Sequence, residues 1–215
     1  MLLLGTMCCC DVATISRAIT TTAVTFATTF AGHVTMPPIT TLQQQYFLGD
    51  NIIGALDGTD FKLAHPYSQT KLATNFYRGD KGHHFHLALI LSDKNLRVIW
   101  AALGIPGHAN DQGAYKQTNL FTWLAEQHHR VAILTDGGFT GPDFIRPVVQ
   151  PVSPTGLLWN EVLRQERAGA EHANCYLKHW RILTEPFHGA HSLHTLVVFS
   201  ILVIYNCRLT FSQIH

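Results

Sequence analysis

The stretch that decides the fold is Asn51–Gly58, which reads NIIGALDG. Its run of aliphatic residues has no charged residue before Asp57, and this predicts a buried strand. An Asp-Gly pair favours a turn, so the strand is expected to end at Asp57-Gly58. The sequence therefore predicts that a core strand presents the carboxylate of Asp57 at its end.

A second stretch repeats this arrangement further along the chain. Val131–Leu134 is another short apolar run, and Asp136 follows it directly before a Gly-Gly pair at 137–138. The pattern again indicates a buried strand that delivers an acid into a turn. Because α/β folds commonly place their sites at the carboxyl ends of strands, we expect Asp57 and Asp136 to lie at one sheet edge.

The rest of the chain mixes strand and helix patterns. Further strands are predicted at Phe61–His65, Phe85–Leu91 and Leu96–Leu103, the last two as a hairpin. Helices are predicted from Asn110 or Asp111 toward Gln127, over Leu158–Lys178 and over Ser192–Leu209, with a shorter one that Asp11 caps before Pro37-Pro38. This order predicts an α/β fold around one mixed sheet.

Two more acids extend the candidate site. Asp111 is predicted at a helix N-terminus and Glu171 inside the helix Leu158–Lys178. Taken singly, each of the four acids is explained by a turn, a cap or a solvated helix face. Taken together, clustered carboxylates repel one another unless a cation neutralises them, and hard divalent ions such as Mg²⁺ or Mn²⁺ prefer oxygen ligands.

Composition limits the class of protein. Apolar residues make up 47% of the chain and charged residues 13%, which indicates a globular core and not a disordered segment. The formal net charge is only +1, so contacts with nucleic acid have to come from a local basic patch. The apolar run Leu196–Tyr205 is about half the ~20 residues that cross a bilayer, so no membrane partner is expected.

Basic and histidine residues gather in one predicted polar loop and the strand after it. Lys71, Arg78 and Lys81 are candidate DNA-binding residues, because phosphate contacts come mainly from such side chains. A zinc site at His83, His84 and His86 is disfavoured, since alternate strand residues face opposite ways and the chain has no partner pair of suitable spacing.

Short motifs in the same order resemble those of PIF/Harbinger-type DDE transposases and their domesticated nuclease relatives. They are Asp57-Gly58-Thr59, Phe76-Tyr77-Arg78 with Lys81-Gly82, Pro106-Gly107 with Asn110-Asp111, Leu134-Thr135-Asp136-Gly137-Gly138-Phe139, Arg167 with Glu171, and Leu177-Lys178 with Arg181-Ile182-Leu183. The resemblance runs from about Asn51 through Asn206.

The resemblance implies an RNase H-like mixed sheet flanked by helices, with Asp57, Asp136 and Glu171 as catalytic acids. All four acids, Asp111 included, correspond to the metal ligands of that family. Asp136 is expected to be the middle acid, because that acid follows the fourth strand of an RNase H-like fold, and Asp111 is expected to be auxiliary. The implied setting is a nuclear protein that acts on DNA, in some relatives with a Myb-like DNA-binding partner, and a homo-oligomer is possible.

Two domains are expected. Residues 1–48 are predicted to be the remnant of a helix-turn-helix region plus a linker, and residues 49–215 the RNase H-like endonuclease domain. Asp11–Arg17 resembles the start of a recognition helix, but the helix that would brace it is missing, so sequence-specific DNA binding is expected to be weak.

Two alternatives stay open. Where this chain has Asp60, His86 and Ile204-Tyr205, the family usually has His, Asn and Leu-His, so a catalytically degenerate, domesticated derivative that binds DNA or protein is one alternative. The other is an unrelated metal-dependent phosphohydrolase, which requires a small-molecule pocket in place of an open basic groove.

Overall fold

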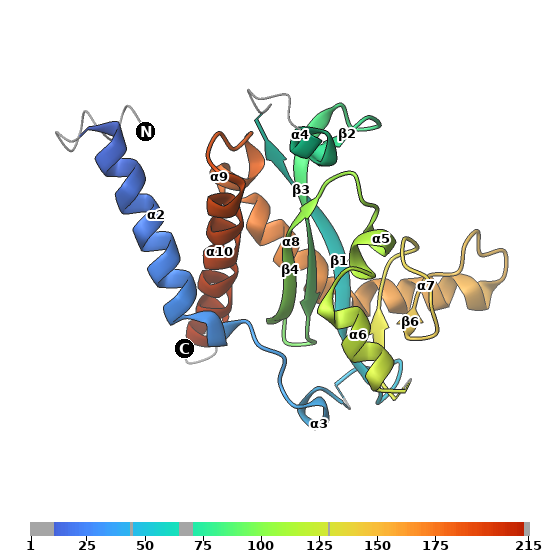
Figure 1. Cartoon of the computed structure of the whole chain (residues 1–215). Helices are drawn as coiled ribbons and strands as arrows, with labels where there is room; N and C mark the ends of the chain where they lie inside the picture. The colour runs from blue at the N-terminus through green and yellow to red at the C-terminus, as the bar shows by residue number, and fades with distance from the viewer. Residues whose placement is uncertain (1–10, 44, 65–70, 129, 213–215) are drawn as a thin grey trace.

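A six-stranded mixed sheet forms the centre of the protein, shown in a computed structural model that describes residues 11–43, 45–64, 71–128 and 130–212 (Figure 1). The strands are β1 Ile52–Leu63, β2 Tyr77–Arg78, β3 His83–Ser92, β4 Val98–Pro106, β5 Ala132–Leu134 and β6 Phe144–Ile145. β3 pairs antiparallel with β1, β2 and β4, whereas β5 runs parallel to β1 and β6 runs parallel to β5. This mixed sheet with helices around it agrees with the predicted RNase H-like fold.

Both faces of the sheet are buried, as β3 shows. Its residues Phe85, Leu87, Leu89 and Leu91 belong to one core cluster, which includes side chains from the helices that follow β4. The residues between them, Ala88 and Ile90, belong to a second cluster with side chains from the C-terminal helices. Since successive strand residues point to opposite faces, an apolar run without alternation is what a strand covered on both sides requires.

Two of the predicted helices are each divided into two shorter ones. They are α2 Val12–Thr29, α3 Ile39–Leu42, α4 Lys71–Phe76, α5 Asp111–Tyr115, α6 Asn119–Glu126, α7 Pro154–Glu166, α8 Ala168–Lys178, α9 Arg181–Thr184 and α10 His191–Ser212. The predicted helix toward Gln127 is two helices, because Thr118 adopts an extended conformation. The predicted helix Leu158–Lys178 is also two helices, which meet at Arg167.

β1 corrects the prediction of a turn at Asp57-Gly58. The strand is continuous over 12 residues, and Asp57 and Gly58 lie in its middle, paired with Ile90 and Leu89 of β3. Phe61–Leu63 is strand as predicted, but it continues β1 and is not a separate strand; His65 lies outside the described residues. The local turn preference of Asp-Gly gives way because β3 offers β1 an uninterrupted partner along this edge.

The predicted hairpin is confirmed by β3 and β4, which pair antiparallel from Ser92↔Val98 to His86↔Pro106. The predicted N-cap is confirmed as well, because Asp11 Oδ1 accepts a hydrogen bond from Thr14 N at 2.6 Å. α2 ends at Thr29, ahead of the two prolines.

α10 is the predicted core helix. It packs against β4, α8 and α2, and α2 runs along its outer side (Figure 1). Asn206 joins three segments, since its amide donates to the carbonyls of His33 and Val98 at 2.7 Å each and accepts from Val98 N at 2.9 Å. By length and composition alone α10 is also able to cross a membrane, a test that core helices of soluble proteins pass too.

Candidate active site

Asp57 lies on β1 and its carboxylate is held from two sides. Asn174 Nδ2 of α8 donates to Asp57 Oδ2 at 2.7 Å, and Gly58 N donates to Oδ1 at 3.0 Å. Burial raises the pKa of Asp57; the hydrogen bond from Asn174 and the charge of the buried Arg167 oppose the rise, whereas the charge of Asp136 adds to it. The site is thus built where β1 passes α8.

Asp136 reaches the same place from the neighbouring strand. The parallel pairing of β1 with β5 ends at Ala55↔Leu134, so two further residues along each strand lead to Asp57 and Asp136. Asp136 Oδ1 accepts from Gly138 N at 2.9 Å, which confirms that β5 delivers this acid into the Gly-Gly turn. Burial raises the pKa of Asp57 and of Asp111, and the charge of Asp136 adds to both rises, so Asp136 lies near both acids.

Asp111 approaches from the opposite face of β1. A Cβ atom added to Gly58 would lie only 2.8 Å from Asp111 Oδ1, so the carboxylate rests directly on this glycine. Neighbouring strand residues point to opposite faces, so Asp57 faces α8 and position 58 faces α5. The pKa of Asp111 is raised by burial and then by the charges of Asp136 and Asp57.

A pair of reciprocal hydrogen bonds fixes Asp111 relative to Asp136. Gln112 Nε2 donates to the carbonyl of Thr140 and Gln112 Oε1 accepts from Thr140 N, both at 2.9 Å. Gln112 follows Asp111 on α5, and Thr140 lies in the turn after Asp136. The two acids are consequently carried by segments that are joined to each other.

Glu171 is placed differently from the three aspartates. It lies in the first turn of α8, its side chain is exposed, and its charge acts weakly on Arg164. Among the described residues no interaction joins Glu171 to Asp57, Asp111 or Asp136. Instead α8 reaches the aspartates through Asn174, one turn after Glu171, so the role of Glu171 stays a prediction.

Comparison with known protein families identifies the family of the chain. A family model described as DDE superfamily endonuclease matches residues 56–206, which is most of the chain and includes all four acids. The chain belongs to the DDE superfamily endonucleases. No curated protein and no solved structure matches it significantly.

In this DDE endonuclease the predicted polar loop is partly regular structure. Lys71 begins α4, and its side chain lies outside the described part; Arg78 belongs to the short strand β2, and Lys81 follows it. Arg78 pairs with Asp80 at 2.8 Å and Lys81 pairs with Asp60 at 3.2 Å. Burial raises the pKa of Asp111, and the charges of Arg78 and Lys81 partly oppose that rise, so these two side chains form a basic rim beside the acidic site.

The histidines of β3 have other surroundings. His84 packs against Tyr77, and His86 lies in a cluster of rings with His191 and His194 of α10. Within the residues that the structure describes, no three His, Cys, Asp or Glu side chains are arranged to hold one metal ion together. That holds for the aspartates as well, which approach β1 from two faces.

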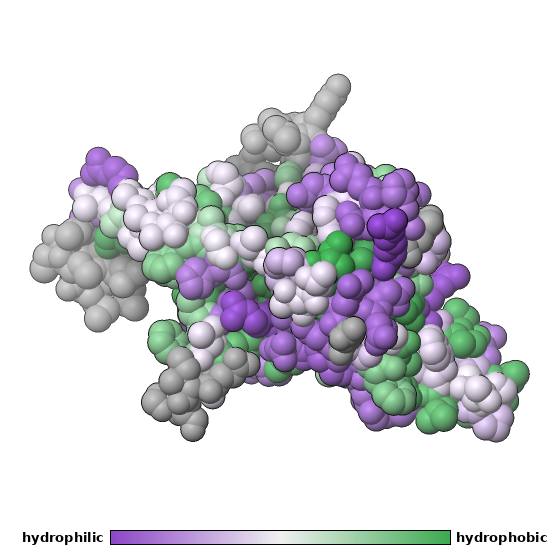
Figure 2. All heavy atoms as spheres, turned by 90° about the horizontal axis from the view of Figure 1, so that it is seen from below, coloured by the Kyte–Doolittle hydropathy of each residue, from purple (hydrophilic) through white to green (hydrophobic). Residues whose placement is uncertain are grey.

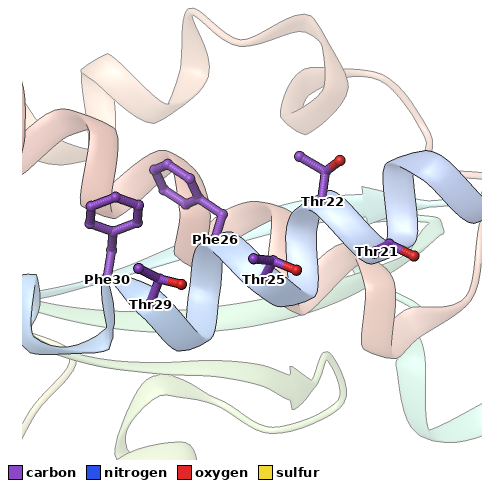
Figure 3. Close-up of a pocket in the computed structure, with 6 residues that line it drawn as sticks. All are labelled: Thr21, Thr22, Thr25, Phe26, Thr29 and Phe30. Carbon is purple, nitrogen blue, oxygen red and sulfur yellow. The ribbon is translucent and has the colours of Figure 1, made fainter.

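The pocket in Figure 3 belongs to another part of the DDE endonuclease. It lies on α2 and its C-cap and is lined by Thr21, Thr22, Thr25, Phe26, Thr29 and Phe30. None of these side chains is ionisable, and α2 packs on α10 at the side of the molecule away from α5 (Figure 1). This pocket therefore takes no part in the acidic site.

Three site residues escaped the prediction from sequence. Asn174 and Gln112 bind the acids or their turns, and Gly58 leaves room for Asp111. Asn174 had a detectable signal, because it lies three positions after Glu171 and so on the same face of a helix. Gln112 and Gly58 had none, since their roles depend on contacts between segments far apart in the chain.

Proposed function

We propose that this DDE endonuclease is the catalytic domain of a PIF/Harbinger-type transposase or of a domesticated nuclease derived from one, and that it cleaves phosphodiester bonds of DNA with Mg²⁺ or Mn²⁺. The observation that carries the proposal is the placement of three aspartates: Asp57 and Asp136 follow the paired residues of the parallel strands β1 and β5, and Asp111 rests on Gly58 of β1. The sequence motifs named above support the Harbinger type.

The donor set suits a hard divalent cation. Carboxylates are the ligands that Mg²⁺ and Mn²⁺ prefer, and the repulsion among Asp57, Asp111 and Asp136 leaves negative charge that a cation would compensate. Asp57 and Asp136 would hold the ion, with Asp111 as an auxiliary ligand and Glu171 as the acid from α8. When bound, such ions activate the attacking oxygen and stabilise the leaving oxygen of a phosphodiester.

The protein's own residues have the tasks of fixing the acids and directing DNA to them. Asn174 and Gly58 N hold Asp57, and Gln112 joins the segments of Asp111 and Asp136. Arg78 and Lys81 border the acids and would bind the phosphates on either side of the bond to be cut. For Lys71 the same role rests on the sequence alone.

The test is nicking of supercoiled plasmid in Mg²⁺ or Mn²⁺ by the wild type, Asp57→Asn and Asp136→Asn. Each variant is expected to lose more than about 100-fold, the upper range for loss of even an outer partner of a metal ligand. Glu126→Gln, which changes an exposed acid on α6, is the matched control and is expected to nick like the wild type. Equal nicking by all four proteins would refute the proposal.

Binding of DNA is tested separately with Arg78→Ala and Lys81→Ala. Each is expected to weaken binding of any duplex to a similar degree and to reduce the slope of log affinity against log salt by about 1, as loss of one phosphate contact does. An unchanged slope in both variants would show that Arg78 and Lys81 do not contact the phosphates of bound DNA.

A degenerate DNA- or protein-binding derivative is the second candidate. The observation in its favour is that, among the described residues, no three acids are arranged to hold one metal ion together. It predicts no rise in melting temperature with Mg²⁺, whereas a metal that binds only the native state has to raise it. A nuclear location and a Myb-like partner follow from the family resemblance alone; imaging of a fluorescent fusion and co-purification with such a partner would test them.

A further inference from the structure

Asn174 is a buried polar residue on an otherwise apolar side of α8. Ala170 and Leu177, which share its face of the helix, are both 0% exposed, and Asn174 itself is 6% exposed. Its Nδ2 donates to Asp57 Oδ2 at 2.7 Å, but its Oδ1 is buried and has no hydrogen-bond partner among the described residues.

Stability alone does not explain an amide at this position. A buried acceptor without a partner costs roughly 1–3 kcal/mol, and an apolar residue of similar size would avoid that cost. The contact that the amide does make is with a carboxylate, the group whose orientation matters most in this site. The position is therefore better explained by what Asn174 does to Asp57 than by packing.

The contact leaves Asp57 with a defined set of free lone pairs. An ionised carboxylate has about four acceptor positions on its two oxygens. Gly58 N takes one on Oδ1 and Asn174 takes one on Oδ2, so the plane of the carboxylate is fixed while each oxygen keeps an acceptor position. Residues that hold a metal ligand in this way commonly determine the affinity of the site for its ion.

α8 is well suited to carry such a residue because it is anchored at both ends. At its N-terminal end Gly169 packs so closely on the carbonyl of Asp93 that a Cβ atom would lie at 2.9 Å. Toward its C-terminal end Leu177 is completely buried. Asn174 lies between these anchors, so the helix fixes the amide relative to β1.

We propose that Asn174 is a positioning residue of the nuclease site, which orients the carboxylate of Asp57 toward the divalent cation. This inference rests on the proposed function, and it assigns to α8 a contribution besides that predicted for Glu171. The cation contacts Asp57, and Asn174 acts through Asp57.

The first experiment measures Mn²⁺ binding by electron paramagnetic resonance for the wild type, Asn174→Ala and Asn174→Asp, with Cys175→Ala as the control at the neighbouring exposed position. Asn174→Ala is expected to bind Mn²⁺ about 10–100-fold more weakly. Asn174→Asp keeps the shape but lacks the donor, and is expected to bind no more tightly than Asn174→Ala. Tighter binding by Asn174→Asp than by the wild type would make position 174 a direct ligand and overturn the positioning role.

The second experiment tests the contact itself in EDTA, without any metal. Melting temperatures of Asp57→Ala, Asn174→Ala and the double variant are expected to be non-additive, since the second substitution removes a partner that is already lost. Additive effects would show that the two side chains do not interact and would overturn the inference. The cycle compares melting temperatures, so it remains informative even when Asn174→Ala is less stable than the wild type.

Failure of the two proposals gives different results. A wild type that binds no Mn²⁺ and nicks no DNA overturns the proposed function and the positioning role with it. A wild type that does both, together with an Asn174→Ala variant equal to Cys175→Ala in Mn²⁺ affinity and Mg²⁺ dependence of nicking, overturns the positioning role alone.

Discussion

At the scale of single residues, Gly58 contributes to the site because it has no side chain. It lies in the middle of β1, where glycine weakens a strand, and the carboxylate of Asp111 occupies the space that a side chain would need. Because Gly58 has no side chain, Asp111 lies against one face of β1 while Asp57 projects from the other face.

Substitution Gly58→Ala is expected to displace Asp111 and to leave the fold intact. The new Cβ atom would lie 2.8 Å from Asp111 Oδ1, and a carboxylate at the end of a side chain moves more easily than the backbone. We expect weaker Mn²⁺ binding with nearly unchanged far-ultraviolet circular dichroism. Gly79→Ala, where no atom lies within 4 Å of the added carbon, is the control.

Substitution Asp111→Asn is expected to stabilise the metal-free protein at neutral pH. Burial and the charges of Asp136 and Asp57 raise the pKa of Asp111, so the folded state favours its protonated form. Protonation of Asp111 stabilises the folded protein fully below the pKa that this acid has in the unfolded chain. This stabilisation is lost as the pH rises through the pKa in the folded state, so at neutral pH the ionised acid opposes folding. The variant should melt higher than the wild type at pH 7 in EDTA.

The same comparison at about pH 3, below the unfolded pKa of Asp, should show little difference, since both states are then protonated. Asp80→Asn changes an exposed acid and should not raise the melting temperature at either pH. A wild type that melts higher than Asp111→Asn at pH 7 would contradict the expected repulsion.

At the scale of elements, Asn206 connects α10, β4 and the segment after α2. Its two amide hydrogens and its oxygen are all used, by the carbonyls of His33 and Val98 and by Val98 N. Asn206 is 0% exposed and Val98 1%, so the backbone groups of Val98 have no water to replace the amide. The N-terminal segment is therefore held to the sheet by one side chain in addition to the packing of α2 on α10.

Substitution Asn206→Leu is expected to lower the free energy of unfolding by at least about 2 kcal/mol, because it leaves the buried N–H and carbonyl of Val98 unpaired. Chemical denaturation at equilibrium measures this loss. Gln117→Ala removes an exposed amide next to α5 and is expected to change stability by less than about 0.5 kcal/mol. A similar loss in both variants would contradict the structural role of Asn206.

Elements differ in how well the sequence predicts them. The β3–β4 hairpin and α10 were predictable because apolar runs and breakers determine them locally. β1 was not, since its continuity through Asp57-Gly58 depends on pairing with β3, which no local signal reports. The interruption of the helix at Arg167 was missed for a similar reason. The residue lies inside a good helical pattern, and the charge of its buried guanidinium opposes the burial that raises the pKa of Asp57.

At the scale of the whole molecule, the sheet and its C-terminal helix meet at a cluster of aromatic and histidine rings. His194 of α10 is 0% exposed, stacks on Phe187 at 4.5 Å and meets Phe61 edge-on. His86 of β3 lies 5.4 Å from it, between ring centroids, and His191 lies close to His86. No hydrogen-bond partner for either nitrogen of His194 is found in the described part of the chain.

The protein is expected to lose stability as the pH falls below about 6.5. Burial, followed by the nearby histidines, lowers the pKa of His86 to about 3 and that of His194 to about 4. The unfolded chain therefore binds protons first, and stability present above pH 6.5 is lost as the pH falls toward these values, by about 1.4 kcal/mol per pH unit for each proton. Urea denaturation at several pH values measures this dependence.

The variant His194→Phe should show a flatter pH dependence, because it keeps a ring against Phe61 and Phe187 but binds no proton. His179→Phe, at an exposed histidine, should keep the dependence of the wild type. Identical slopes for the wild type and His194→Phe would exclude the buried cluster as the source of acid sensitivity.

The architecture as a whole was predictable from the sequence, whereas the arrangement within the site was only partly so. Asp57 and Asp136 follow from the order of two apolar runs, and the parallel pairing of β1 with β5 brings them together as expected. That Asp111 lies across β1, and that α8 meets Asp57 through Asn174, depends on helix packing that periodicity does not encode.

The far end of α7 adds an uncharged projection to the molecule, which Figure 2 shows as apolar atoms at its tip. Its exposed apolar side chains are Leu157 and Leu158 of α7 and Val148, Val149 and Val152 in the segment before α7. Single exposed apolar residues need no explanation, but these lie close together along the chain. They do not belong to the three core clusters, so the fold gains little from them.

The raised pKa values of Asp57 and Asp111, which result from burial and from neighbouring charge, also bear on the long-term history of such a chain. Acids that oppose folding are maintained by selection for chemistry alone, because their neutral replacements relieve strain on the fold. A lineage that no longer benefits from cutting DNA would thus drift toward more stable descendants without these charges. The sheet and helices would survive in them as a scaffold on which other uses can arise.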